Sequence, residues 1–310
     1  MATIEKQRHG NHDYFYLSKS IRVSSEKVRK IRVFLGRKMP SHDELQTHFK
    51  ELEKKTPKSY VPKLLSRKTV ERLDDLAAAS QLFEGIKQDL LPKDFLVRFT
   101  YNTNAIEGNP LTLRQTALIL SDKIAPQGAK TEDVVEVLNG GDAWDFVKGF
   151  KGKLTNGFIR KIQFEVTKNT SCRIQGNFRD SEVRITGSEW KPPLAKEIPG
   201  QIEKLVEEYS STKKIRHPVE LASFLHNRLV QIHPFTDGNG RSARLLMNWV
   251  LIRNRFPPAI IENAIKEEYY RMIETADKGV EKPFAEFLAR QLLEQYAVLD
   301  AKTSPITSKD

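Results

Sequence analysis

The chain has 310 residues, 39% hydrophobic and 29% charged, which is typical of a globular protein, and its one cysteine, Cys172, excludes both a disulfide framework and a cysteine-built zinc site. No early apolar run resembles a signal peptide, and the most apolar stretch, residues 245–252, is too short to span a bilayer, so we expect a cytoplasmic protein with no membrane partner. The net charge of +11 suits a nucleic acid, an acidic partner or a phosphorylated substrate, but equally a solvated basic surface.

The first 65 residues predict an appendage made of a β-hairpin and a charged helix. Residues 14–36 alternate apolar and polar on both sides of a Ser-Ser-Glu-Lys break, which indicates a two-stranded hairpin ending at Gly36. Ser41 suits the N-cap of a helix over residues 42–55. Eight lysines and arginines lie between residues 19 and 38, so much of the positive charge falls here.

Residues 66–300 predict one mainly α-helical domain, because most of this region repeats apolar residues at helical spacing. Residues 176–188 break the trend with a short alternation between glycines, which favours a small β-hairpin. We call these residues the flap segment. The tail, residues 301–310, is expected to be disordered.

The stretch HPFTDGNGRSAR, residues 233–244, is predicted to be a loop between two helices. Residues 218–232 carry an apolar stripe with three- and four-residue steps, typical of a helix packed on a core. Pro234 disfavours helix at the residue before it, His233. A second helix is expected to start near Asn239.

This loop has the residues of an anion site at a helix N-terminus, where free N–H groups and the helix dipole attract negative charge. Gly238 and Gly240 allow the backbone to approach a ligand closely. Arg241 and Arg244 share one helix face and offer two guanidinium groups suited to phosphate oxygens.

Two further residues complete a polyphosphate site with a metal and a base. Asp237 suits a divalent cation that bridges phosphates, and His233 has the near-neutral pKa that a general base requires. The alternative is that His233 is a hydrogen-bonded structural residue in an ordinary turn. Zinc is disfavoured, since His226 and His233 have no third histidine or cysteine at ligand spacing.

The same twelve residues resemble the Fic (filamentation induced by cAMP) family, whose signature is HPFx[DE]GNGRxxR, and the resemblance extends from about residue 95 to 295. It implies a helical-bundle core that binds ATP and Mg²⁺ and transfers AMP to a Ser, Thr or Tyr hydroxyl of a target protein, releasing pyrophosphate. His233 would be the base and Asp237 the Mg²⁺ ligand. The phosphates would contact the following residues: Gly238, Asn239, Gly240, Arg241 at the β-phosphate and Arg244 at the γ-phosphate.

The resemblance also assigns the ends of the nucleotide and target sites. Tyr270 and Asp277 lie where the family frames the adenine, although Tyr270 also suits a core tyrosine. The flap segment lies where the family aligns the target, whose extended backbone pairs with an exposed strand edge. Its target-docking residues are expected to be Phe178, Arg179, Val183 and Ile185, with Phe178 and Ile185 equally suited to a core.

Residues 103–108, TNAIEG, predict a helix end at which an acidic residue stands in an electrostatically unfavourable position. Gly108 and Pro110 end the helix, so Glu107 lies in its last turn, where the dipole disfavours negative charge. Fic proteins carry an inhibitory helix with the pattern [ST]xxxE[GN], which Thr103, Glu107 and Gly108 match. The resemblance therefore implies an inhibitory helix near residues 96–108, whose Glu107 pairs with Arg244 and holds the enzyme inactive.

Other functions stay open at this point. The enzyme is expected to be a protein adenylyltransferase, but a bifunctional or AMP-removing Fic enzyme, with Glu107 activating water, is an alternative. A DNA-binding regulator that uses the basic hairpin is the rival from another class. Self-modification and a homodimer are compatible with the resemblance, and the target protein is not specified.

Overall fold

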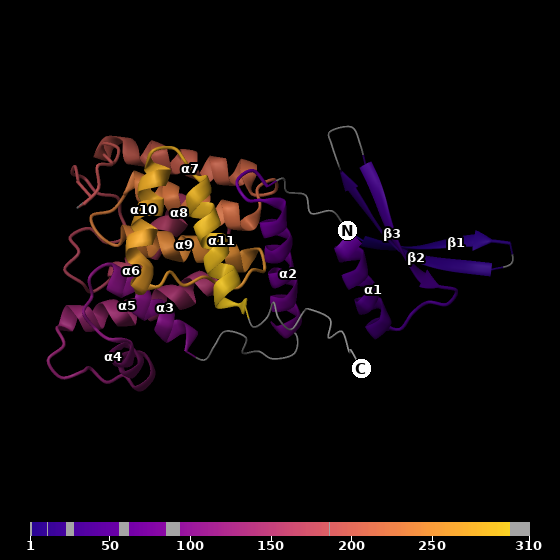
Figure 1. Cartoon of the computed structure of the whole chain (residues 1–310), viewed down its shortest axis with the longest axis horizontal. Coiled ribbons are helices and arrows are strands. Elements are labelled where there is room, and N and C mark those ends of the chain that lie inside the picture. Colours follow the sequence, from indigo (N-terminus) through magenta and orange to yellow (C-terminus); the bar gives the residue numbers. More distant parts are fainter. Residues whose placement is uncertain are drawn as a thin grey trace. The chain divides into compact units, whose positions relative to one another are not determined.

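The structure is a computed structural model that describes residues 2–10, 12–22, 28–55, 62–84, 94–185 and 187–297. The chain divides into two compact units, Met1–Tyr60 and Val61–Asp310, which are coloured along the sequence in Figure 1. The predicted disordered tail lies outside the described residues.

The first unit is a three-stranded antiparallel sheet, β1-β2-β3, with one helix. Its elements are β1 (Ala2–His9), β2 (His12–Arg22), β3 (Val28–Gly36) and α1 (His42–Lys55). The sheet packs Leu17 and Val33 against Leu52 of the helix. Ser41 starts α1, since its backbone N–H and hydroxyl both donate to the Glu44 carboxylate, at 2.8 and 2.9 Å.

The predicted hairpin corresponds to β2 and β3, but the sequence prediction missed β1. Ile4 is the one large apolar residue of this strand, so its sequence, ATIEKQRH, shows no clear alternation. A tight turn after His9 pairs β1 with β2 instead, helped by the left-handed Gly10, whose φ is 61°.

The second unit is mainly α-helical, as the sequence predicted. Its longer helices are α2 (Arg67–Glu84), α3 (Phe95–Ile106), α5 (Thr131–Gly149), α6 (Asn156–Thr167), α7 (Ile198–Thr212), α8 (Pro218–Ile232), α9 (Asn239–Arg253), α10 (Lys266–Asp277) and α11 (Lys282–Gln295). Shorter turns are α4 (Leu113–Ala117), a π-helical turn (Leu118–Asp122) and 3₁₀ turns at Ala195–Glu197 and Asn263–Ile265. No described helix is long and apolar enough to cross a membrane.

Helices α8 and α9 pack against each other at the centre of this unit, with α5, α6, α7 and α11 around them (Figure 1). Helix α9 is buried on nearly every side from Arg241 to Leu251, which explains its continuous apolar run. Trp249 fills the space between α9 and its neighbours and contacts the rings of Phe158 and Tyr209, with centroids 5.1 and 5.8 Å apart. The loop between α8 and α9 is therefore held by two buried helices.

Helix α3 is fixed against α5 by aromatic packing and a close approach. Phe95 and Phe99 both contact the Trp144 ring, with centroids 4.9 Å apart. Gly140 allows this approach, since a Cβ there would lie 2.7 Å from Cγ2 of Thr100 on α3. The end of α3, which carries Glu107, is thus placed by the core.

The flap segment is not the regular hairpin that its sequence predicted. Of its described residues, 176–185 and 187–188, none belongs to a strand. The buried side chain of Arg179 donates to the backbone carbonyl of Ser181 at 2.8 Å. In a hairpin such a carbonyl would accept from the backbone of the paired strand, so here a side chain replaces the strand partner. A short alternation of apolar and polar residues between glycines cannot distinguish a β-hairpin from an irregular loop held by a side chain.

Candidate functional site

His233 stands where α8 ends, in a left-handed backbone conformation with φ 47° and ψ 57°. Its N–H still donates to Leu229 O at 3.0 Å, and Pro234 prevents the helix from continuing. Burial lowers the pKa of His233, although the Val230 backbone opposes the shift. The imidazole is therefore mainly neutral near pH 7, as a proton acceptor must be.

Arg179 holds the backbone of His233 in place, and its guanidinium is buried among backbone carbonyls, whereas the docking role expected for it calls for an exposed side chain. Its guanidinium is buried and donates to the carbonyls of His233 at 2.9 Å and Pro193 at 2.6 Å, while its N–H donates to Pro234 O at 2.9 Å. The sequence shows only a charged residue in a loop, which suggests an exposed binding residue, whereas a buried arginine has a structural role.

We expect Arg179→Met to lower the free energy of unfolding by about 2–4 kcal/mol, because several buried carbonyls lose their donor. Urea unfolding measures this. Arg173→Met is the matched control: Arg173 is exposed and pairs only at the surface with Asp180, so about 1 kcal/mol or less is expected. Equal losses in both variants would contradict the clamp.

The N-terminus of α9 is shaped by Gly238 and by the side chain of Asn239. Gly238 has φ 78°, and a Cβ there would lie 2.9 Å from Cγ2 of Thr167. The side chain of Asn239 accepts from Phe235 N at 3.0 Å and donates to Phe235 O at 2.9 Å, which leaves its backbone N–H for the expected phosphate contact. Asn239 therefore fixes the loop, and the backbone N–H groups remain as the anion donors.

Asp237 and Arg241 form the outer edge of the site. The Asp237 side chain is 51% exposed and accepts from Gly238 N at 2.6 Å and from Arg241 Nη2 at 3.0 Å. Arg241 also donates to Glu136 of α5 at 2.7 Å. Among the described residues, no group of three or more His, Cys, Asp or Glu is arranged to hold a metal.

Glu136 is a residue that the sequence analysis missed. One of its oxygens accepts from Arg241 and the other from Asn109 Nδ2 at 2.9 Å, so it links the segment after α3 to the loop. Nothing in the spacing of residues 131–149 marks this acid among the others of α5.

Arg244 lies at the centre of a buried network. Its guanidinium donates to Thr103 Oγ1 and Thr103 O, both at 2.8 Å, and to Glu107 Oε1 at 2.6 Å. Arg244 Nη1 also donates to the Tyr269 hydroxyl at 3.2 Å, and this hydroxyl lies 2.9 Å from Nε2 of His226. Burial raises the pKa of Tyr269 to about 12, so its hydroxyl stays protonated.

The Glu107 carboxylate occupies the space directly beside the α9 N-terminus. A Cβ built on Gly240 would overlap Glu107 Oε1, so the acid and the glycine are in close contact. The carboxylate thus lies where an anion bound to the α9 N-terminus would lie. The side chain of Arg244 is 2% exposed and that of Glu107 is 35% exposed, so solvent reaches the carboxylate but hardly the guanidinium.

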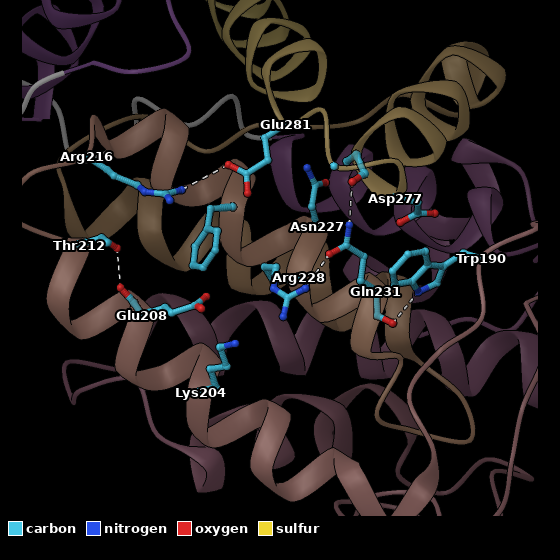
Figure 2. A pocket seen from close by; sticks show the side chains of 13 residues that line it. Trp190, Lys204, Glu208, Thr212, Arg216, Asn227, Arg228, Gln231, Asp277 and Glu281 are labelled. Atoms are coloured by element: carbon cyan, nitrogen blue, oxygen red, sulfur yellow. Dashed lines mark hydrogen bonds and ion pairs between the residues drawn. The ribbon is translucent and has the colours of Figure 1, made fainter.

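Tyr270 and Asp277 of α10 have different surroundings. Tyr270 is 39% exposed, which excludes a core position, and its hydroxyl donates to Ile106 O at the end of α3, at 3.0 Å. Asp277 lines a cavity of about 590 Å³ with Trp190 and Gln231, shown in Figure 2; burial raises the pKa of Asp277. The residues that line this cavity include none of the loop 233–244.

The remaining flap residues lie beside the loop. The Phe178 ring packs on Phe235, with centroids 5.8 Å apart, while Val183 and Ile185 are half-buried. Gln163 of α6 ties both segments together, since it donates to Asp237 O at 3.1 Å and accepts from Gly176 N at 2.6 Å. The arrangement suits binding of a polyphosphate at α9, with a neutral imidazole at its edge.

A family model described as Fic/DOC family matches residues 153–251. The protein adenylyltransferase Fic of Nematostella vectensis is 36% identical over 203 residues, which cover 64% of this chain and 47% of that protein. The chain spans about half the length of the curated relatives that it matches.

Two solved structures share the fold. A Fic domain containing signaling protein from Bacteroides thetaiotaomicron has a TM-score of 0.65 at 28% identity, covering 77% of this chain and 100% of that one. Fic-1 from C. elegans has a TM-score of 0.67 at 25% identity, covering 85% of this chain and 78% of that one.

Proposed function

Because this chain belongs to the Fic family, we propose that it is a protein adenylyltransferase, which moves AMP from ATP to a side-chain hydroxyl of a target protein. The observation that carries the proposal is the position of a neutral His233 beside an anion site at the α9 N-terminus. We assign the activity to residues 66–300 and treat residues 1–65 as an appendage.

In this proposal His233 is the general base. It takes the proton of a Ser, Thr or Tyr hydroxyl while the hydroxyl oxygen bonds to the α-phosphorus of ATP. The bond from that phosphorus to the bridging oxygen breaks, and pyrophosphate leaves. The lowered pKa of His233 supports the role, because a protonated ring could not accept.

The phosphates would bind the backbone N–H groups after Gly238, with Arg241 at the β-phosphate and Arg244 at the γ-phosphate. Asp237 fits a shared Mg²⁺, because its carboxylate is half-exposed at the same edge and carboxylate oxygen is a ligand that Mg²⁺ accepts. Bound Mg²⁺ neutralises phosphate charge. Tyr270 and Asp277 are proposed to contact the adenine.

Glu107 would inhibit this reaction in cis. Its carboxylate binds Arg244 and fills the space beside Gly240, so a γ-phosphate and Glu107 compete for the same guanidinium edge. Thr103 and Tyr269 also bind Arg244 and would continue to hold it when Glu107 is displaced. Displacing the acid therefore frees the site without moving the arginine.

Target alignment is proposed for the flap segment without Arg179. The half-buried Val183 and Ile185 would contact an extended target segment, and Phe178 would support them from the Phe235 side. Modification of the chain itself gives a convenient readout when no target is known.

The transfer rate is expected to be constant near pH 7 and to fall as the pH drops below 6.5, with a midpoint below the ordinary histidine value. The sign follows from the base form being the deprotonated ring, whose population decreases with acid. Initial rates of AMP transfer between pH 5 and 8 measure it. A midpoint above 6.5 would show that burial does not set the pKa of His233.

Intact-mass measurement of the Glu107→Gly variant after incubation with ATP and Mg²⁺ tests the function. A gain of one AMP, with label retained from the α-phosphate and lost from the γ-phosphate, is expected. A gain of phosphate, or no gain on the chain or on any protein of a cell extract, would reject adenylyl transfer.

AMP removal is the second candidate, favoured by the Glu107 carboxylate lying beside Gly240 in the site. There Glu107 would accept a proton from the water that attacks the phosphorus of the attached AMP; the bond from that phosphorus to the side-chain oxygen breaks, the oxygen takes up a proton to restore the hydroxyl, and AMP leaves. Wild-type protein would then strip AMP from a chain modified beforehand by the Glu107→Gly variant, and the variant itself would not.

A further inference from the structure

The sheet of the first unit has one face covered by a helix and one open face. Leu17 and Val33 point toward α1 and form a core with Leu52. Since side chains alternate along a strand, Tyr16 and Phe34, which lie opposite each other in β2 and β3, point to the other face. Phe34 is 51% exposed there.

Three aromatic rings gather on this open face. The Phe34 ring lies 5.3 Å from Tyr16 and 6.2 Å from Tyr14, measured between centroids. The guanidinium of Arg37 lies 5.5 Å from the Tyr14 ring. A half-exposed phenyl ring in a polar surrounding offers a flat apolar surface to a planar ligand.

Positive charge surrounds the rings. Residues 1–60 hold 14 lysines and arginines against seven acids, so this fifth of the chain carries +7 of the net +11. Lys30 and Arg32 lie four and two positions before Phe34 in β3, on the same face and exposed. Cations beside exposed rings match a polyanion with flat, apolar bases.

We propose that this open face binds single-stranded nucleic acid, with unpaired bases stacked on Phe34 and the tyrosines and with phosphates on Lys30 and Arg32. The rings favour a single strand over a duplex, because stacking already covers the base faces in a duplex. The proposal does not depend on adenylyl transfer, which involves the other unit.

One acid on the same face competes with the phosphates. Glu5 of β1 forms ion pairs with both Lys30 and Arg32, the latter at 3.3 Å. Both cations remain exposed by more than two fifths of their side chains, so a phosphate can reach them. Removing the Glu5 charge should therefore strengthen binding, an effect opposite in sign to that of the other substitutions.

Anisotropy of a labelled, mixed-sequence oligonucleotide of roughly 16 nucleotides, as DNA and as RNA, tests the proposal on the full chain. Phe34→Ala is expected to weaken binding about 5-fold or more. Lys30→Gln with Arg32→Gln should reduce the slope of log affinity against log salt by about 1.4. Glu5→Gln should tighten binding.

The matched control is Lys6→Gln with Arg8→Gln, which removes the same charge from the alternate positions of β1, on the opposite face. It should leave affinity within about 2-fold, because contacts rather than net charge set the effect. Thermal melts of every variant separate lost binding from lost folding.

Absence of binding up to about 100 µM at low salt would overturn the proposal. So would an equal loss in the control pair, or a duplex bound as tightly as the single strand with no effect of Phe34→Ala. None of these results bears on AMP transfer, so the two proposals fail separately.

Discussion

Replacing His233 by alanine should reduce AMP transfer by about 10²–10⁴-fold while leaving ATP binding within a few-fold. The imidazole is the proposed proton acceptor, whereas phosphate binding uses the α9 backbone and the arginines. The reaction is best followed in the Glu107→Gly background, where transfer is expected to be fastest, and ATP binding by calorimetry.

The left-handed backbone of His233 complicates an alanine substitution, since alanine is strained at φ 47°. His233→Asn is the matched variant, because asparagine tolerates this conformation but does not accept the proton. Equal losses in both variants assign the effect to chemistry. Recovery of transfer in the asparagine variant would remove His233 from the base role.

Replacing Glu107 by glycine should raise the transfer rate at least about 10-fold, because the γ-phosphate no longer competes with a carboxylate for Arg244. The same change should lower the free energy of unfolding without nucleotide by about 1–3 kcal/mol, since a buried guanidinium loses its charged partner. ATP should then stabilise the variant more than the wild type in thermal melts.

Glu262→Gln provides the control for this result. Glu262 lies outside α3 and pairs with Arg98 of α3, the helix that ends at Glu107; the distance is 2.9 Å. The variant therefore removes an ion pair of α3 without touching Arg244. Its transfer rate should match that of the wild type. Activation by Glu262→Gln would mean that any loosening of α3 releases the enzyme, and that the Glu107 carboxylate has no special part.

The helical fold and the loop 233–244 follow from local rules. The apolar stripe of residues 218–232 and the placement of Pro234 are enough to end α8 and start α9 near Asn239. The strand β1 was missed because its pairing with β2 comes from the turn at Gly10 and from neighbours, with no alternation of its own.

Side-chain partners were harder to predict than positions. Tyr269 and Tyr270 are adjacent, and only the phase of α10 distinguishes the buried one from the exposed one; Ala276, seven residues after Tyr269, is on the buried stripe and was the available signal. For Arg179 no such signal exists. Its partners are the backbone carbonyls of residues 181, 193 and 233, and every residue has such a carbonyl, so the sequence does not indicate which ones Arg179 binds.

The bonds of Arg179 also define a cassette for protein engineering. One guanidinium binds Ser181 O near the start of the segment 180–192 and Pro193 O directly after it, and it also binds the backbone carbonyl of His233. A grafted segment of different sequence would then begin and end at fixed points, provided that the arginine itself is kept. Retargeting by exchange of residues 180–192 should therefore preserve the catalytic register, whereas a graft that starts one residue earlier should lose it.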